Sequence, residues 1–167
     1  MTATKHGRAS EQASVSTDGV APPPGAPGAP GAMPDTRAVN FYDAAPYLRF
    51  LLRRRLDAAE LAAAEPRLRE LGARIGAELE DLAAEADRQS PPLIARDKRG
   101  EQVNDVAPSR AYRDLERILY GEFGMAAMAM RPGILQPDRA SSLVANDAFI
   151  YLASQAESGL FCPLDMT

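Results

Sequence analysis

The chain has 167 residues, a formal net charge of −4 and a single cysteine, a length that fits one domain and a tail. The first 39 residues carry equal numbers of acidic and basic side chains, so the net negative charge falls on the rest, which argues against nucleic-acid binding as its main role. No apolar run approaches the ~18 residues of a membrane span, and Cys162 alone permits no internal disulfide, which fits a reducing cytoplasm.

Residues 1–39 are expected to be a disordered tail. Within it, residues 21–34 read APPPGAPGAPGAMP, a Pro/Gly/Ala tract that cannot bury enough apolar surface to fold. The only histidine, His6, lies in this tail, so the rest of the chain has no histidine base or metal ligand. CxxC, GxGxxG and P-loop motifs are also missing. The sequence therefore predicts no catalytic residue and no metal site.

The first expected helix runs over about Ala44–Leu56, with Asp43 as its N-cap and Pro46 in its first turn. Arg49 and Arg53–Arg55 lie toward its C-terminal end, where positive charge suits the helix dipole. Contact with an anion or a nucleic acid is the alternative interpretation of these arginines.

A second, longer helical pattern follows a predicted capping box formed by Asp57 and Glu60. Apolar residues recur in steps of three or four from Leu61 to Leu82, which is one face of a helix. Proline inside a helix costs ~3 kcal/mol, so Pro66 predicts a break or kink, with Glu65–Asp87 as the principal helix.

Gly72 and Gly76 lie four residues apart within this helix. Each costs ~1 kcal/mol relative to alanine there, which is tolerable where another helix approaches closely. The pair thus indicates tight packing, and surface tolerance is the other interpretation.

Beyond Pro92, Leu93–Asp97 and Glu101–Val106 flank a turn, and predict a β-hairpin with Gly100 at positive φ. A helix over about Ser109–Phe123 should follow, with Ser109 as N-cap.

The methionine-rich stretch Met125–Met130 is interpreted as adaptable core filler, with the wall of a ligand pocket as the alternative. The last helix is expected over about Ala140–Ser158, apolar around much of its circumference and capped by Gly159. After Gly159 the chain should run extended through apolar residues. We interpret this stretch as the beginning of a further structural unit that the chain does not contain.

The predicted fold class is all-α: four to five helices and a small hairpin after the Pro/Gly/Ala-rich tail. Residues 39–167 resemble the N-terminal helical domain of the acyl-CoA dehydrogenase superfamily, and within it the adaptive-response, AidB-type branch. The segments that carry the resemblance are Asn40–Tyr42, Arg96–Gly100, Val106–Tyr112 and, most strongly, Ala153–Thr167. It divides the chain into the tail 1–39, the helical domain 40–160, and residues 161–167 as the start of a β-domain.

The resemblance implies an FAD-dependent oxidoreductase that performs α,β-dehydrogenation of an acyl-CoA thioester. It implies that Leu164, Met166 and Thr167 face the flavin, with the Thr167 hydroxyl donating to a ring heteroatom. The family's catalytic carboxylate lies in a C-terminal helical domain to which no residue here corresponds, so this fragment is expected to be inactive. Ser109 and Arg110 stand where the branch usually has His-Pro, which marks a divergent member.

Further expectations from the resemblance are an acyl-CoA substrate, a homo-oligomer in the complete protein, no membrane and a cytoplasmic location. The alternative is a non-catalytic helical interaction module that pairs with a partner chain or with a second copy. Nucleic-acid binding through Arg49 and Arg53–Arg55 is the least favoured hypothesis, because the domain is net negative.

Overall fold

The computed structural model describes residues 35–162. The chain divides into two units, Met1–Asp35 and Thr36–Thr167, and every described helix and strand belongs to the second. In chain order these are α1 (Pro46–Arg55), α2 (Ala58–Arg74), the π-helical turn η1 (Ile75–Leu79), α3 (Glu80–Arg88), β1 (Leu93–Arg96), β2 (Gln102–Val106), α4 (Arg110–Glu116), the π-helical turn η2 (Arg117–Glu122) and α5 (Leu143–Ala153). This confirms the predicted fold class.

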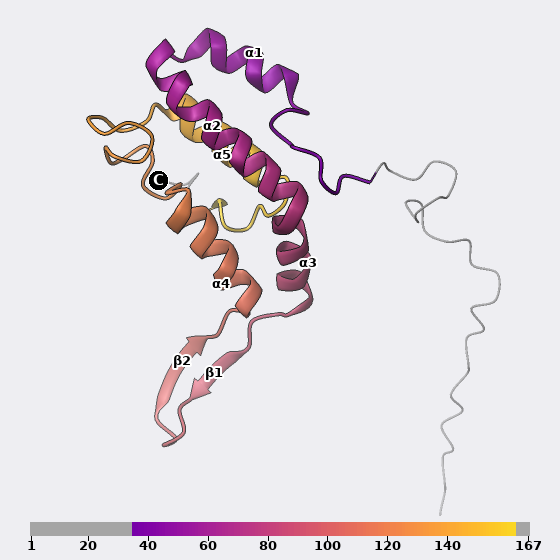
Figure 1. Ribbon diagram of the computed structural model, residues 1–167. Coiled ribbons are helices and arrows are strands. Elements are labelled where there is room, and N and C mark those ends of the chain that lie inside the picture. Colours follow the sequence, from indigo (N-terminus) through magenta and orange to yellow (C-terminus); the bar gives the residue numbers. More distant parts are fainter. Residues whose placement is uncertain (1–34, 163–167) are drawn as a thin grey trace, which may run out of the picture. The chain divides into compact units, whose positions relative to one another are not determined.

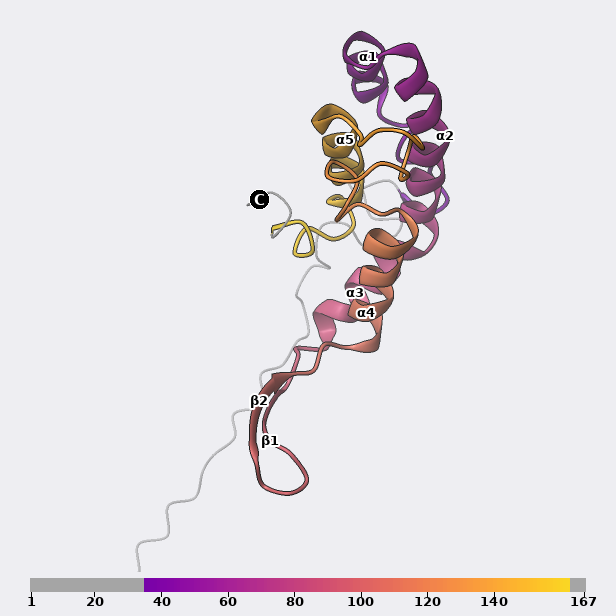
Figure 2. The ribbon, with the colours of Figure 1, turned by 90° about the vertical axis from the view of Figure 1, so that its left-hand side faces the viewer.

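The helices form two contacting pairs joined by the long helical run from α2 into α3. Helix α5 lies beside α2, α1 crosses near one end of both, and α4 lies beside α3 (Figure 1). The hairpin β1–β2 projects from the ends of α3 and α4, away from the other helices (Figure 2). None of the helices in the described part of the chain has the length and hydropathy needed to cross a membrane.

Helix α1 begins at Pro46, not at the predicted Asp43 cap. Its N-cap residue is Ala45, which makes no side-chain capping bond. The Asp43 carboxylate instead accepts a hydrogen bond from Arg69 Nε at 3.2 Å, while the Asn40 side chain accepts from the amide of Asp43 at 3.2 Å. The capping prediction was wrong because Asp43 is engaged by an arginine distant in sequence.

Pro66 lies inside α2 and does not end it. The predicted break was wrong: the irregularity comes later, at η1, after which the helix continues as α3. Leu68, Leu71 and Leu79 are almost completely buried along this run. Packing of that face stabilises the helix enough to offset the hydrogen bond that proline cannot make.

The close packing predicted for Gly72 and Gly76 is present, although the partner is the turn-containing segment that precedes α1 and not a helix. The amide of Phe41 donates to the Gly72 carbonyl at 3.1 Å, and the amide of Ala38 donates to the Gly76 carbonyl at 2.9 Å. A β-carbon at Gly76 would lie 2.3 Å from the carbonyl oxygen of Val39. Only glycine allows the backbone to approach this closely.

The capping box at the start of α2 is half confirmed. Asp57 accepts from the amide of Glu60 at 2.8 Å, as predicted. The Glu60 side chain, which should reach back, is instead buried and accepts from the amide of Ser142 at 2.6 Å. Glu60 therefore joins the start of α2 to the start of α5.

Ser109 caps α4 as predicted, accepting from the amide of Tyr112 at 3.1 Å. The last helix, α5, is shorter than expected: it begins after the cap Ser142 and ends at Ala153. Gly159 is therefore not its C-cap. Although the helix is apolar around much of its circumference, it has an exposed side, with Leu143 at 70% and Tyr151 at 53% exposure.

The hairpin follows the prediction, with Gly100 at φ 85°. Its strands are antiparallel, with Leu93 opposite Val106 and Arg96 opposite Gln102, and the register shifts between these pairs. Asn104 has φ 48° at this irregularity.

The core is a single apolar cluster that includes Met125 and Met128, which confirms the core-filler interpretation for both. Met130, by contrast, is 66% exposed. Phe123 and Phe149 meet in this core with ring centroids 6.5 Å apart.

Candidate functional site

The predicted flavin-facing residues Leu164, Met166 and Thr167 lie outside the described residues, as does the predicted tail up to residue 34. What the structure describes is the segment that leads to them. Gly159–Phe161 form a turn where an extended strand was expected.

Two residues of this turn, Leu160 and Phe161, are buried in the core cluster. The hydroxyl of Tyr120 donates a hydrogen bond to the Leu160 carbonyl oxygen, and Glu157 accepts from the amide of Gly159 at 2.5 Å. The chain preceding Cys162 is thus held by packing and by polar contacts, and Cys162 itself is exposed.

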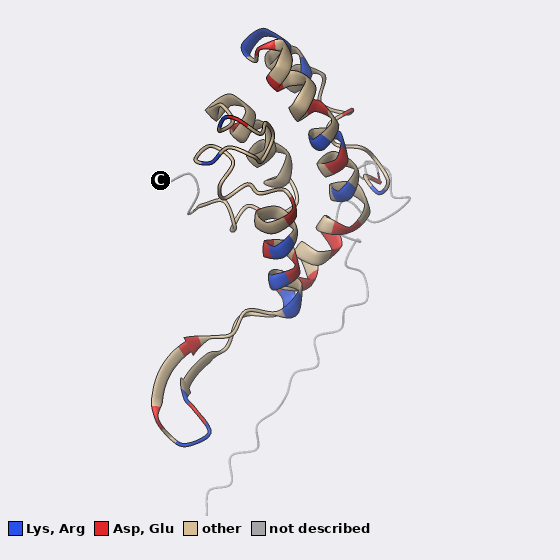
Figure 3. Ribbon diagram, turned by 60° about the vertical axis from the view of Figure 1, so that its left-hand side comes forward, with Lys and Arg blue, Asp and Glu red and all other residues tan. Residues whose placement is uncertain are grey.

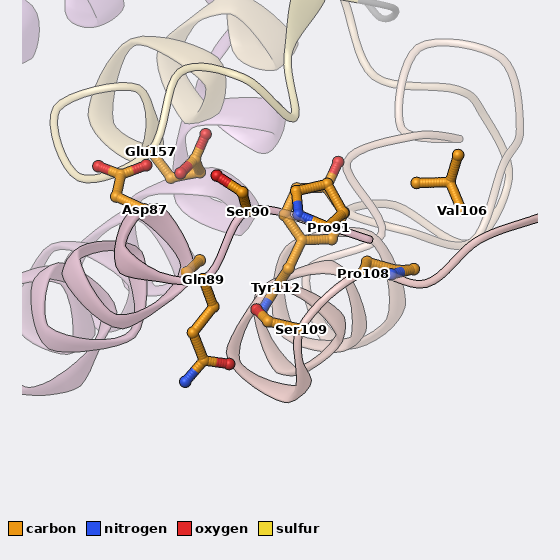
Figure 4. Close-up of a pocket in the computed structure, with 10 residues that line it drawn as sticks. Asp87, Gln89, Ser90, Pro91, Val106, Pro108, Ser109, Tyr112 and Glu157 are labelled. Atoms are coloured by element: carbon orange, nitrogen blue, oxygen red, sulfur yellow. The ribbon is translucent and has the colours of Figure 1, made fainter. Parts of the chain in front are cut away.

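A pocket of about 540 Å³ opens near this turn, where the ends of α3, α4 and the hairpin meet (Figure 4). It combines apolar groups with hydroxyls and two carboxylates, and its lining residues are Ala86, Asp87, Gln89, Ser90, Pro91, Val106, Pro108, Ser109, Tyr112 and Glu157. Three segments distant in sequence therefore build it: the end of α3, the hairpin root with α4, and the chain after α5.

The tyrosines near this pocket share an electrostatic environment. Burial raises the pKa of Tyr112, and the charges of Glu116 and Glu157 raise this pKa further. Burial is also the main cause of the raised pKa of Tyr120. Both phenols therefore stay protonated at neutral pH and can donate hydrogen bonds, as Tyr120 does to Leu160.

The hydroxyls and carboxylates that line this pocket can form hydrogen bonds with a bound molecule. No histidine occurs within residues 35–162, so none of the described side chains can act as a histidine base for Ser90 or Ser109. Within residues 35–162, no three His, Cys, Asp or Glu side chains gather as a group that could hold a metal ion. The pocket was not predicted from the sequence, because its residues share no local pattern.

Arg53–Arg55 lie in the last turn of α1, as the dipole interpretation expects, but Arg49 lies near the start of the helix, so the prediction was wrong for that residue. Arg49 lies 4.0 Å from Asp43, and Arg54 stacks over the Phe50 ring at 5.9 Å. Figure 3 shows acidic and basic residues interleaved along α2 and α4. This distribution gives the nucleic-acid interpretation no added support.

Comparison with known proteins assigns the chain to a protein family. The sequence model of the adaptive response protein AidB N-terminal domain matches residues 32–167. A solved structure, "Bd2924 apo-form", is similar with a TM-score of 0.66 and 27% sequence identity. The match covers 78% of this chain and 25% of that one, so the chain spans about a quarter of the length of its structural relative. No curated protein matches. Because the family match extends over most of the sequence, the chain belongs to the AidB N-terminal domain family, which is acyl-CoA dehydrogenase-like.

Proposed function

We propose that this chain is the N-terminal helical portion of an FAD-dependent, acyl-CoA dehydrogenase-like oxidoreductase. The observation that carries the proposal is the family match, which extends over residues 32–167 and so includes the segment predicted to meet the flavin. In this proposal residues 40–160 are the helical domain and residues 161–167 open the β-domain. The cytoplasm, an acyl-CoA substrate and a homo-oligomer belong to the same proposal.

The side chains of the terminal segment suit a flavin. Leu164 and Met166 offer apolar contact to a flat ring system, and Thr167 offers a hydroxyl donor for its ring heteroatoms. The buried turn at Leu160 and Phe161 supports the proposal, because it gives these residues a fixed point of departure. The flavin, when bound, supplies the redox chemistry, and these residues orient it.

The chain itself supplies no catalytic group in this proposal. The family resemblance puts the carboxylate that removes the α-proton in a C-terminal helical domain, with no counterpart among these residues. The helical portion contributes binding and positioning, in keeping with a pocket that has hydroxyls and carboxylates but no histidine.

The test uses the protein as its source organism makes it. The gene is tagged at its N-terminal end on the chromosome, and the product is purified for its mass and visible absorption spectrum. We expect flavin absorption that bleaches when an acyl-CoA is added without oxygen. A purified product without flavin would contradict the proposal.

A pair of threonine variants sharpens this test. Thr167→Ala should lower the flavin content of the purified protein, because it removes a hydroxyl donor at the ring. Thr17→Ala, which lies outside the family match, is the control and should leave the flavin content unchanged. Equal flavin content in the two variants would exclude the role proposed for Thr167.

A non-catalytic interaction module is the second candidate. The exposed row on α1 favours it: Tyr47 is 84% exposed, Phe50 59% and Leu51 51%. Apolar side chains grouped in this way often mark a protein contact. The same purification separates the two candidates, since a module would copurify with a partner and carry no flavin.

A further inference from the structure

The irregularity in the hairpin decides which side chains share a face. In a regular strand, residues an odd number of positions apart point to opposite faces, so Val103 and Val106 would be separated. Here Ile94 is opposite Asp105 and Arg96 is opposite Gln102, which leaves Ala95 facing two residues of β2. This is a β-bulge, with Asn104 in the left-handed region at φ 48°.

The bulge collects the apolar residues of the hairpin on one face. Paired residues share a face, so Leu93 and Val106 lie together, and the bulge adds Val103 to the same side as Ala95. The opposite face carries Arg96, Gln102 and Asp105, with Ile94 as its only large apolar residue. We call the set Leu93, Ala95, Val103 and Val106 the apolar arm face.

Nothing within residues 35–162 covers this face. Leu93 is 64% exposed, Val106 54% and Val103 48%, and every strand residue of the hairpin is exposed. A two-stranded hairpin by itself is marginally stable in water. An apolar face on such an arm is stabilised when it is covered.

The apolar arm face continues into the pocket at the hairpin root, because Val106 belongs to both. The pocket adds Pro91, Pro108 and Tyr112 to the apolar surface (Figure 4). Its charged lining residues are Asp87 and Glu157, both acidic. Arg110 and Arg113 lie near the root, but Arg110 pairs with Asp114 at 3.7 Å and Arg113 donates to the Pro108 carbonyl at 3.1 Å.

The far end of the arm is weakly positive, because Arg96, Lys98 and Arg99 outnumber Asp97 and Glu101. Lys98 and Arg99 stand in the turn, and neither side chain has an ion pair with another described residue. The nearby Asp97 carboxylate is occupied by the amides of Arg99 and Glu101, at 2.8 and 2.9 Å. The arm is therefore acidic at its root and basic at its tip, with an apolar face between.

We propose that the hairpin is a dimerisation arm whose occupant is a second copy of this chain. Two arms related by a two-fold axis pack their apolar arm faces together and run in opposite directions. The arms are equal in length, about 23 Å at ~3.3 Å per residue, so the tip of each one reaches the root of the other. Lys98 and Arg99 then lie beside Asp87 and Glu157 of the other copy. The interface is isologous, as two-fold dimers require.

The first test measures the mass of the 167-residue chain by sedimentation from about 1 µM to about 1 mM, a range that brackets small interfaces. We expect a monomer–dimer equilibrium. The double variant Leu93→Thr/Val103→Thr keeps β-branched side chains but makes the face polar, and should weaken the dimer by about tenfold or more. Ile94→Thr, on the opposite face, is the matched control and should dimerise like the parent.

A chain that stays monomeric throughout would overturn the proposal, as would equal weakening by the double variant and the control. Circular dichroism of each variant shows whether the helices are intact. Neither measurement depends on flavin, so a failure here leaves the proposed function standing.

Charge exchange tests the tip-to-root pairing. Lys98→Glu should weaken the dimer, and adding Asp87→Lys in the same chain should restore it, since each copy then offers a reversed pair. A double variant as weak as the single one would contradict this pairing.

Crosslinking tests the two-fold arrangement itself. In a Cys162→Ser background, Val103→Cys lies near the middle of the arm and should join two chains through a short bismaleimide. Arg96→Cys, which also lies near the middle of the arm but on the opposite face, should not. Equal crosslinking of the two would overturn the face-to-face arrangement.

Discussion

Gly76 occupies a position where a single added carbon has a defined obstacle. Its β-carbon would lie 2.3 Å from the Val39 carbonyl oxygen and 3.2 Å from the Val39 amide nitrogen. Both obstacles are backbone atoms, so no side-chain rotation relieves the clash. The segment that precedes α1 would have to leave the helix, which would break the bond from the Ala38 amide to the Gly76 carbonyl.

Gly76→Ala should therefore destabilise the chain by about 1–3 kcal/mol, the range for overpacked sites. Gly121→Ala is the matched control: it also lies in a helical turn, η2, with open space around its β-carbon position. This second change should stabilise by up to about 1 kcal/mol, because alanine favours a helix over glycine. Urea unfolding of both variants checks the pair, and equal effects would show that the segment 36–42 does not hold the helix.

Tyr42 has the most perturbed ionisation of the described tyrosines. Its ring is buried, and its hydroxyl donates to Glu65 at 3.3 Å. Burial, followed by the negative charge of Glu65, raises its pKa from 10.0 to about 12. Between these two values the unfolded chain loses this proton and the folded chain keeps it.

The free energy of unfolding should therefore fall as the pH rises from about 10 to about 12, since the folded state binds more protons there. Below pH 10 both states are protonated, so this residue contributes no pH dependence. Tyr42→Phe should flatten this alkaline decline, and the exposed Tyr151→Phe should leave it unchanged. Urea unfolding across this pH range, with tyrosinate absorbance as a second readout, measures it. An unchanged slope in Tyr42→Phe would contradict the assignment.

At the scale of elements, α2 and α5 are joined at their beginnings by one buried carboxylate. Glu60 is 4% exposed and accepts from the Ser142 amide at 2.6 Å. Ser142 in turn caps α5 by accepting from the Ala145 amide at 3.2 Å. An exposed pair closes the same junction, with Arg139 at 2.6 Å from Asp57.

Glu60→Ala should lower the free energy of unfolding by about 1–3 kcal/mol, because it leaves the Ser142 amide without its acceptor. Glu60→Gln keeps an acceptor oxygen and should cost less. Asp57→Asn preserves the cap while weakening the pair with Arg139, and it serves as the control for surface charge. Urea unfolding ranks the three. A Gln variant as unstable as the Ala variant would show that the carboxylate's charge, and not its acceptor, holds the junction.

Elements specified by nearby residues were predicted well from the sequence. Asp57 and Ser109 cap helices because their bonds reach only three residues ahead, and Gly100 supplies the positive φ of its own turn. These contacts depend on local geometry alone. The buried methionines Met125 and Met128 also followed from their composition.

Features that depend on distant residues were not predicted. Pro66 remains helical because the buried face of α2 packs on α5, and Glu60 turns toward Ser142, 82 positions away. The pocket was not predicted from the sequence for the same reason, since its lining residues Asp87, Ser109 and Glu157 come from separate segments of the chain. Asn104 could have indicated the bulge, because asparagine tolerates the left-handed region. The three-residue spacing of Val103 and Val106 did not predict it, because that spacing also occurs in helices and in regular strands.

For the whole molecule, we expect the helical core to determine the stability of the fold and the hairpin to determine dimerisation. The core comes from the helices, the loop after η2 and the turn at Leu160, and no strand residue of the hairpin belongs to its buried set. The hairpin is attached at one end, where the Ala107 amide donates to the Pro92 carbonyl at 3.1 Å. The two chain segments are thus adjacent at the root, and a short link can join them.

Replacing residues 93–106 with a short Gly/Ser turn should therefore change the free energy of unfolding by only about 0.5 kcal/mol, as for other exposed sites. The shorter connection between α3 and α4 offsets part of any loss, because closing a smaller loop costs less entropy. The same deletion should abolish the dimer. Urea unfolding and sedimentation on one sample measure the two effects. Unfolding of the helices in this variant would mean that the hairpin stabilises α3 and α4. A dimer that persists would mean that the two copies contact each other elsewhere, for example through the exposed residues Tyr47, Phe50 and Leu51 of α1.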